Sequence, residues 1–243
     1  MKKIIITLIL PILLFSGNVF AEEIDPEDKF STSKTKNKAK GSAATSSNST
    51  ANVIFFDVPW GSHIDYVYGL NFGFPIAENA DNVTGFDFGF FVSATKVVHG
   101  AQMSFFGNES GYVHGFQAAI IKNHLDFDFN GMQLCIYNAV DNSFSGFQAG
   151  AINTVNNDFD GIQLSIINNI KDSLTGSQIG VLNFTDNTVN GSQLGLLNNT
   201  KFFSGFQFGG INDTQHGHGF QFGVLNFMEN GFLPFFPIVN FSR

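Results

Sequence analysis

Apolar and polar positions alternate with period two through most of the chain. In the segment 159–170, Ile162, Leu164 and Ile166 fall on one face of an extended chain, and Gln163 falls on the other. This period predicts a β-strand with two different faces. A helix would need apolar residues at i, i+3 and i+4, and the frequent glycines would weaken it.

The alternation belongs to a tandem repeat with the pattern G-x-Q-x-G-x-x-N, which is clearest at 176–183 and 191–198. Successive units begin 14 to 16 residues apart. Eleven units are recognisable, and a degenerate twelfth covers 231–241. Such a period is typical of repeat architectures. The units begin at Gly69, Gly85, Gly100, Gly115, Gly131, Gly146, Gly161, Gly176, Gly191, Gly205 and Gly219.

Asn and Asp dipeptides such as 141–142, 156–157 and 186–187 lie midway between units. They favour tight two-residue hairpin turns, and an odd period of 15 keeps the apolar side chains on one face through each turn. We therefore expect an all-β fold, an up-and-down antiparallel β-barrel or meander of about 12 repeat strands, because closure removes exposed edges. The alternative is a parallel β-solenoid with 15-residue coils, in which Asn and Gln stack as ladders.

The orientation of the strands decides which face meets solvent. We expect the apolar positions to fill a barrel core and the Gly and Gln positions to form the outer surface. Three alternating apolar sites cover only about 20 Å of strand, less than the apolar band of about 25 Å of a membrane barrel. In the opposite orientation, the apolar positions would meet lipid in an outer-membrane-embedded β-barrel or pore.

Residues 1–21 have the features of a secretory signal peptide. Lys2 and Lys3 form a basic start, 4–15 is an apolar segment too short to span a bilayer, and Ala21 ends a small-residue cleavage site. The sequence therefore predicts export of the mature chain.

Two further regions follow the predicted leader. Residues 22–52 are rich in Ser, Thr, Asn and Lys and poor in apolar residues, which predicts a disordered polar linker. Residues 53–243 form the predicted β-repeat barrel domain. We expect Trp60 to pack at the barrel rim, and we expect 238–241 to pair with an early strand.

Composition limits the classes of function. Charged residues make up only 13% of the chain, and the net charge is −8. Nucleic-acid binding requires a basic surface, so nucleic acid is excluded as a partner. The negative charge also gives no attraction to anionic lipid headgroups.

Residues 69–241 resemble bacterial surface-repeat proteins built from tandem Gly-Leu-Gln-Ile-Gly-Leu-Ile-Asn units. These proteins often end in Leu-Pro-Phe-Phe-Pro, an apolar pair and Asn-Phe, as 233–241 do here. The resemblance implies a shallow, symmetric β-barrel of the type called a β-flower and a location at the cell surface. It implies no particular activity, although some relatives are labelled polyhydroxyalkanoate synthases.

No residue is assigned a catalytic, cofactor-binding or metal-ligating role. Cys135, the single cysteine, lacks the nucleophile elbow that synthase chemistry would need, and it occupies a position where other units have Gly or Ser. The segment 126–131 imitates the start of a calcium loop, but Tyr137 stands where a bidentate Glu is required. His99 and His114, in adjacent units, are expected to be surface polar residues.

The sequence therefore predicts a non-catalytic exported protein of the cell envelope or surface, with a binding or structural role and no cofactor. Its partner stays open, with a membrane or another envelope component as the expected class. The expected location is the outer membrane or cell surface, with the periplasm as a further compartment.

Overall fold

The computed structural model describes residues 50–243, which form β-strands and turns without a helix. The predicted signal peptide over 1–21, and all but the last three residues of the predicted linker over 22–52, lie outside the described residues. The first strand begins at Thr50, so regular structure starts three residues before the predicted boundary at 53.

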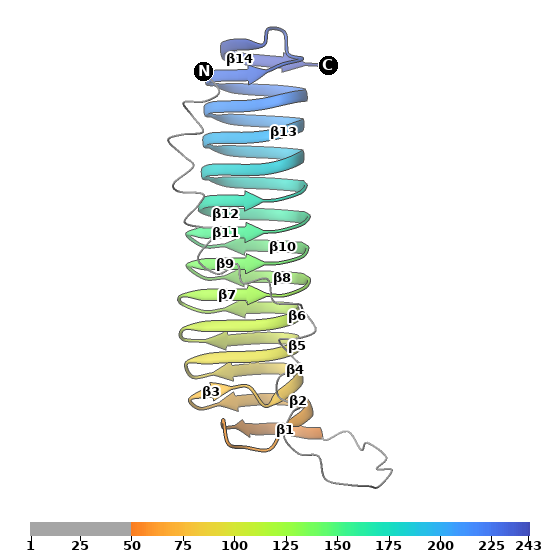
Figure 1. Cartoon of the computed structure of the whole chain (residues 1–243), viewed down its shortest axis with the longest axis vertical. Helices are drawn as coiled ribbons and strands as arrows, with labels where there is room; N and C mark the ends of the chain where they lie inside the picture. Colours follow the sequence, from red (N-terminus) through yellow and green to blue (C-terminus); the bar gives the residue numbers. More distant parts are fainter. Residues whose placement is uncertain (1–49) are drawn as a thin grey trace, which may run out of the picture. The chain divides into compact units, whose positions relative to one another are not determined.

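The described part of the chain contains β-strands that follow one another with short bends between them (Figure 1). One of them, β13, continues without a break around several turns of the chain. The strands are β1 (Thr50–Asp57), β2 (Ile64–Gly73), β3 (Ile76–Ala77), β4 (Ala80–Gly89), β5 (Val92–Ser104), β6 (Gly107–Ala118), β7 (Lys122–Leu125), β8 (Phe129–Leu134), β9 (Tyr137–Val140), β10 (Phe144–Ala149), β11 (Ile152–Val155), β12 (Phe159–Ile170), β13 (Leu174–Met228) and β14 (Phe235–Ser242).

Neighbouring strands from β1 to β13 are parallel, and each residue lies beside its equivalent one repeat away. Gln163 of β12 pairs with Gln178 of β13, and Asn168 pairs with Asn183. The same offset joins β2 to β4, β4 to β5 and β5 to β6. The chain is therefore a parallel β-solenoid whose coils are about 15 residues apart.

The expected all-β class and tandem repeats are confirmed, and the fold is the solenoid alternative. The predicted antiparallel barrel is wrong. The Asn and Asp dipeptides lie at bends where successive coils stack, so that Asn156 donates to Asp141 at 3.2 Å and Asn157 donates to Asn142 at 3.1 Å. Their chemistry favours a bend, but it does not determine whether the chain returns beside itself or crosses to a second layer.

Each coil contributes one strand to each of two layers. One layer holds the strands with the repeat Gln, such as β8 and β10, and the other holds the strands with the repeat Asn, such as β7, β9 and β11. Figure 1 shows the two sets alternating along the stack. The narrow space between the layers is the core.

The amide side chains face this core, and the apolar side chains between them face outward. Gln163 and Asn168 are fully buried, whereas Ile162 and Leu164 are 46% and 43% exposed. The expected orientation, with the apolar positions inside and Gln outside, is therefore reversed.

Buried amides are tolerated because they bond to one another in two continuous ladders. Each repeat Gln from Gln117 to Gln221 donates from Nε2 to Oε1 of the repeat Gln one coil earlier, at 2.7–3.1 Å. Each repeat Asn from Asn108 to Asn212 donates from Nδ2 to Oδ1 of the repeat Asn one coil later, at 2.8–3.3 Å. The ladders run in opposite directions, and a second hydrogen of most Asn amides bonds a backbone carbonyl, as from Asn168 to Ile179 at 3.0 Å.

Apolar side chains fill the rest of the core. The rings of Phe129, Phe144 and Phe159 stack with centroids 4.8 and 4.9 Å apart and are parallel within 4°. The same core cluster contains Leu125, Val140, Val155 and Ile170, which come from the Asn-bearing layer. Identical side chains one coil apart therefore pack on each other along the stack.

The first glycine of every unit adopts a backbone conformation that other residues rarely reach. The eleven glycines have φ between 125° and 141°. A Cβ on Gly161 would overlap the carbonyl oxygen of Gly146 in the coil before it. Glycine is needed here for its backbone conformation and for the close approach of the two coils.

The C-terminal end of the stack is closed by an antiparallel strand. β14 pairs with the last coil, with Gln221 opposite Asn240 and Gly219 opposite Ser242. The predicted pairing of 238–241 with an early strand is therefore wrong. Pro237 in β14 has no N–H to donate, which disfavours the addition of another strand.

The N-terminal end of the solenoid begins with β1, which pairs in parallel with β2. Trp60, in the turn that follows β1, is 82% exposed and does not pack at a rim as predicted.

We predict that Gly161→Ala lowers the free energy of unfolding by about 3 kcal/mol or more, because it combines a strained φ with a backbone overlap. Chemical denaturation followed by far-UV circular dichroism measures the effect. Gly107→Ala is the control, since Gly107 does not have a positive φ and its Cβ would lie 3.2 Å from the nearest atom. Equal losses of stability in the two variants would contradict the requirement for glycine at position 161.

Candidate functional site

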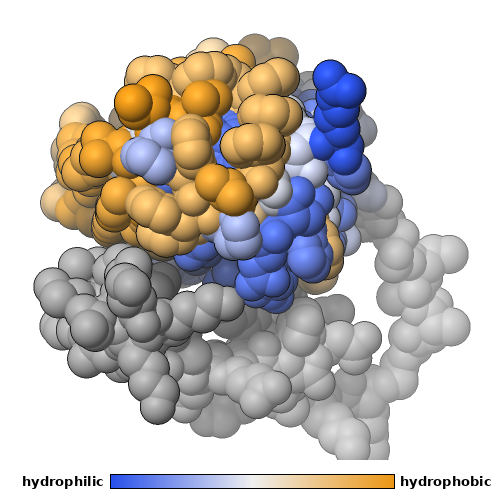
Figure 2. Space-filling view, turned by 90° about the horizontal axis from the view of Figure 1, so that it is seen from above, coloured by the Kyte–Doolittle hydropathy of each residue, from blue (hydrophilic) through white to orange (hydrophobic). Residues whose placement is uncertain are grey.

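The outer surface of the solenoid has an apolar edge, the bend that follows the Gln-bearing strand of each coil. Ile136, Ile166 and Leu196 occupy equivalent positions there and are 55%, 57% and 64% exposed. Figure 2, viewed from one end of the stack, shows hydrophobic residues gathered on one side. The apolar edge consists of Phe105, Phe106, Ile120, Ile121, Ile136, Ile166, Val181, Leu196 and Val224, flanked by Leu164, Ile179, Leu194 and Phe208.

The other bend of each coil forms a polar edge. One residue per coil stacks there in register, and the column contains most of the acidic and basic side chains that the bends carry. The column consists of Asp65, Asp81, Lys96, Gly111, Asp126, Asp141, Asn156, Lys171 and Asp186. This column lies at the bend opposite the apolar edge, although Lys122, 4.0 Å from Glu109, follows directly after Ile121 of the apolar edge.

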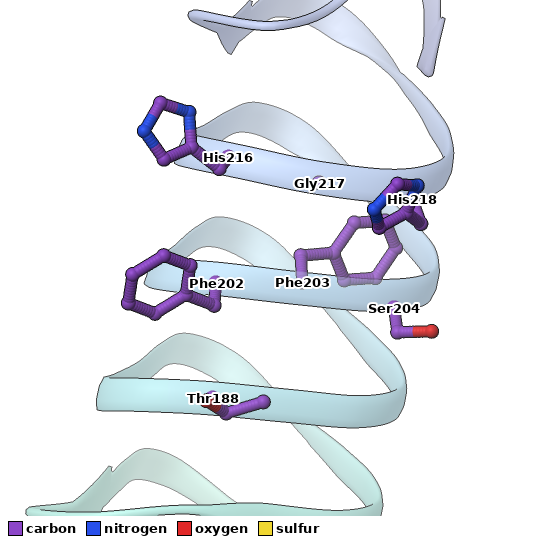
Figure 3. A pocket seen from close by; sticks show the side chains of 7 residues that line it. All are labelled: Thr188, Phe202, Phe203, Ser204, His216, Gly217 and His218. Atoms are coloured by element: carbon purple, nitrogen blue, oxygen red, sulfur yellow. The ribbon is translucent and has the colours of Figure 1, made fainter. Parts of the chain in front are cut away.

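Within residues 50–243, the amide ladders and apolar columns pack the space between the two layers. A shallow depression lies instead on the surface near Phe202 and His216, whose ring centroids are 6.0 Å apart (Figure 3). Gly217 lies between His216 and His218, and a Cβ there would come within 3.2 Å of Phe203 and Met228. Phe203 and Met228 thus already fill the space beside Gly217, and the depression contains no nucleophile hydrogen-bonded to a base.

Stacking also brings histidines of different coils together. The rings of His99 and His114 stack with centroids 5.2 Å apart and an interplanar angle of 12°. An antiparallel meander would have placed equivalent residues together only near its middle, whereas the solenoid pairs every equivalent position.

Asp87 is a buried carboxylate where later coils have Gln. It accepts hydrogen bonds from Asn71 at 2.8 Å on one oxygen, and from Ser93, Thr95 and Gln102 at 2.6–3.1 Å on the other. Asn71 in the coil before and Gln102 in the coil after both donate to Asp87. Because the carboxylate of Asp87 only accepts, the Gln ladder ends at this residue. Burial raises the pKa of Asp87, and the four hydrogen bonds oppose that rise.

Cys135 is a poor candidate for a nucleophile. It is buried in a column of small residues that includes Gly150 and Ser165, and burial raises its pKa. At Gly150 a Cβ would lie 2.9 Å from Nδ2 of Asn138, so this column must stay small beside the Asn ladder. The helix that a nucleophile elbow requires is absent from 50–243.

The structure reveals two features that the sequence prediction missed. The first is the apolar edge, whose residues the sequence analysis expects in a barrel core. The recurrence of Gln and Asn at the same two positions of successive units was the signal that these amides are buried as ladders. The second feature is a cluster of His124, Asp126 and Asp141 on the polar edge. Its signal was an H-x-D triplet followed by an Asp one repeat later.

Comparison of the chain with protein-family models, with curated proteins and with solved structures finds no match. Within 50–243, no helix has the length and apolar character needed to cross a bilayer.

We predict that replacing Asp87 reduces the pH dependence of stability. Burial raises the pKa of Asp87 in the folded state above the unfolded value near 3.8, so the folded state binds a proton at Asp87 more tightly. The free energy of unfolding therefore falls as pH rises from the unfolded pKa through the folded pKa. Asp87→Asn removes the titrating carboxyl. The amide of the new Asn can donate to Oδ1 of Asn71, which is buried without a partner in the wild type, once the Asn71 amide turns toward it.

Urea denaturation of the wild type and Asp87→Asn across the acidic pH range measures this effect. We expect Asp87→Asn to gain stability relative to the wild type as pH rises toward neutrality. Parallel curves for the two proteins would show that Asp87 does not titrate with folding.

Proposed function

We propose that the protein is a non-catalytic exported component of the cell envelope that binds a lipid surface through its apolar edge. The observation that carries this proposal is the row of exposed large apolar side chains along one edge of the solenoid, which is interrupted only at the coils with Ala151 and Gly210 in that position. The apparent leader over 1–21 and the resemblance of 69–241 to bacterial surface-repeat proteins support export.

The apolar edge is large enough to act as a binding surface. Coils stack at about 4.8 Å, so the edge from Phe105 to Val224 is roughly 40 Å long. Even at a width of about 10 Å it covers about 400 Å², within the range of the largest patches on monomeric proteins, which are often functional. Its side chains are aliphatic and aromatic, as interfacial membrane binding requires.

The distribution of charge favours lipid over a polar partner. The acidic column with Asp126, Asp141 and Asp186 lies at the polar edge, so it stays in water when the apolar edge enters a bilayer interface. The net charge of −8 opposes binding to anionic membranes. We therefore expect the partner to be a zwitterionic bilayer surface, which the solenoid contacts without crossing it.

The same geometry supports a non-catalytic role. Cys135 is buried, and Ser204, the hydroxyl that lines the depression beside His216, makes no hydrogen bond to a histidine that would act as its base. The amides inside the ladders are buried and bonded to one another, so they are not available to bind a substrate.

Vesicle flotation tests the proposal, with the full mature chain and phosphatidylcholine vesicles. We predict that the triple variant Ile136→Ser, Ile166→Ser, Leu196→Ser binds about 100-fold more weakly, at about 1 kcal/mol for each partly buried side chain. The triple variant Asn156→Ser, Lys171→Ser, Asp186→Ser on the polar edge is the control and should bind like the wild type.

Two outcomes would overturn the proposal. One is equal vesicle binding by both variants. The other is a wild type that ignores vesicles and forms a dimer dissolved by the apolar-edge substitutions, because a second copy would then be the partner. Cell fractionation with surface proteolysis tests the location separately, and recovery of intact protein from the cytoplasm would contradict export.

A further inference from the structure

The polar edge contains two clusters with the same composition. Each has a His and an Asp two residues apart in one coil, and a second Asp from the next coil. The three ligand atoms of each cluster lie within 4.8 Å of one another. The clusters are His63, Asp65 and Asp81, and His124, Asp126 and Asp141.

The second cluster has the geometry of a cation site. Nε2 of His124 lies 3.2 Å from Oδ1 of Asp126 and 3.6 Å from Oδ2 of Asp141. Two carboxylates of adjacent coils thus converge on one imidazole. The side chains of His124 and Asp126 are only 16% and 19% exposed, whereas Asp141 is 45% exposed, so solvent screens the Asp126 carboxylate less than that of Asp141.

The first cluster shows what such an arrangement attracts. Nε2 of His63 lies 3.4 Å from Oδ2 of Asp81, and the ammonium of Lys96, from the next coil, lies 2.9 Å from the same oxygen. A cation supplied by the chain is therefore seated on this cluster.

The second cluster has an amide at the position that corresponds to this lysine. Asn156, in the coil after Asp141, donates from Nδ2 to Oδ1 of Asp141 at 3.2 Å. This bond leaves the other oxygen, Oδ2, facing His124. Where the first cluster receives a positive charge from the following coil, the second receives a neutral donor.

We propose that His124, Asp126 and Asp141 bind a divalent transition-metal ion, with Zn²⁺ as the probe. Ligands at about 2.1 Å from a tetrahedral Zn²⁺ lie about 3.4 Å apart, and the two distances from Nε2 of His124 bracket this value. One imidazole and two carboxylates favour Zn²⁺ over Ca²⁺, which prefers oxygen ligands alone. Water supplies the fourth ligand.

The ion links consecutive coils. His124 belongs to β7, and Asp141 follows directly after β9, which pairs with β7 in register. Binding to the folded state alone raises stability by mass action, so the melting temperature should rise with Zn²⁺. This site is on the polar edge and does not depend on the proposed lipid binding.

Isothermal titration of the chelator-treated mature chain with Zn²⁺ tests the proposal, together with thermal melting. We expect one ion per chain and a higher melting temperature. Asp141→Asn should weaken binding at least tenfold without unfolding the protein, because Asn already occupies this column at Asn156. His114→Ala, which removes the stacked pair with His99, is the matched control and should bind normally.

A gain of binding provides the sharper test. Lys96→Met removes the ammonium from the first cluster, and we expect a second Zn²⁺ to bind at His63, Asp65 and Asp81. The proposal is overturned if the wild type shows neither binding nor a shift in melting temperature, which would leave the cluster as an ion pair. It is also overturned if the control His114→Ala loses Zn²⁺ binding to the same extent as Asp141→Asn. A third contrary outcome is that Lys96→Met binds no second Zn²⁺.

Discussion

Hydrogen bonding between identical amides one coil apart is the constraint on which the rest of this structure depends. A buried amide without a partner costs on the order of 1–3 kcal/mol, and the core contains two columns of such groups. Each Gln and Asn finds its partner only when the next coil is parallel and in register. If one coil slipped by one residue relative to the next, its Gln and its Asn would lose their partners. The Gln and Asn ladders therefore determine the register of the strands.

The ends of the ladders show the same rule. The Gln ladder ends at Asp87, a group that only accepts. At its other end, Oε1 of Gln221 is buried without a partner, and Oδ1 of Asn108 is in the same position at the start of the Asn ladder. Each ladder has a direction and therefore leaves an unpaired acceptor where no further coil donates to it.

Filling the core with amides moves the apolar residues outward. Period two gives each strand two faces, and once Gln163 is inside, Ile162 and Leu164 must be outside. The apolar edge is thus a consequence of the same pattern that builds the core. The two bends of each coil then differ in chemistry, because large apolar side chains predominate at one and the column from Asp65 to Asp186 lies at the other.

The sequence by itself determined the strands, the unit length and the glycines, because period two and the 15-residue spacing are local properties. It also determined the identity of residues that repeat, such as Gln163 and Gln178. Only the tertiary structure decided whether units run parallel, since the bends at Asp141 and Asn156 suit either connection. It also decided which face is buried and which side chains of different coils meet, as His124 and Asp141 do, because contacts across coils depend on register, and register is set by the buried amides.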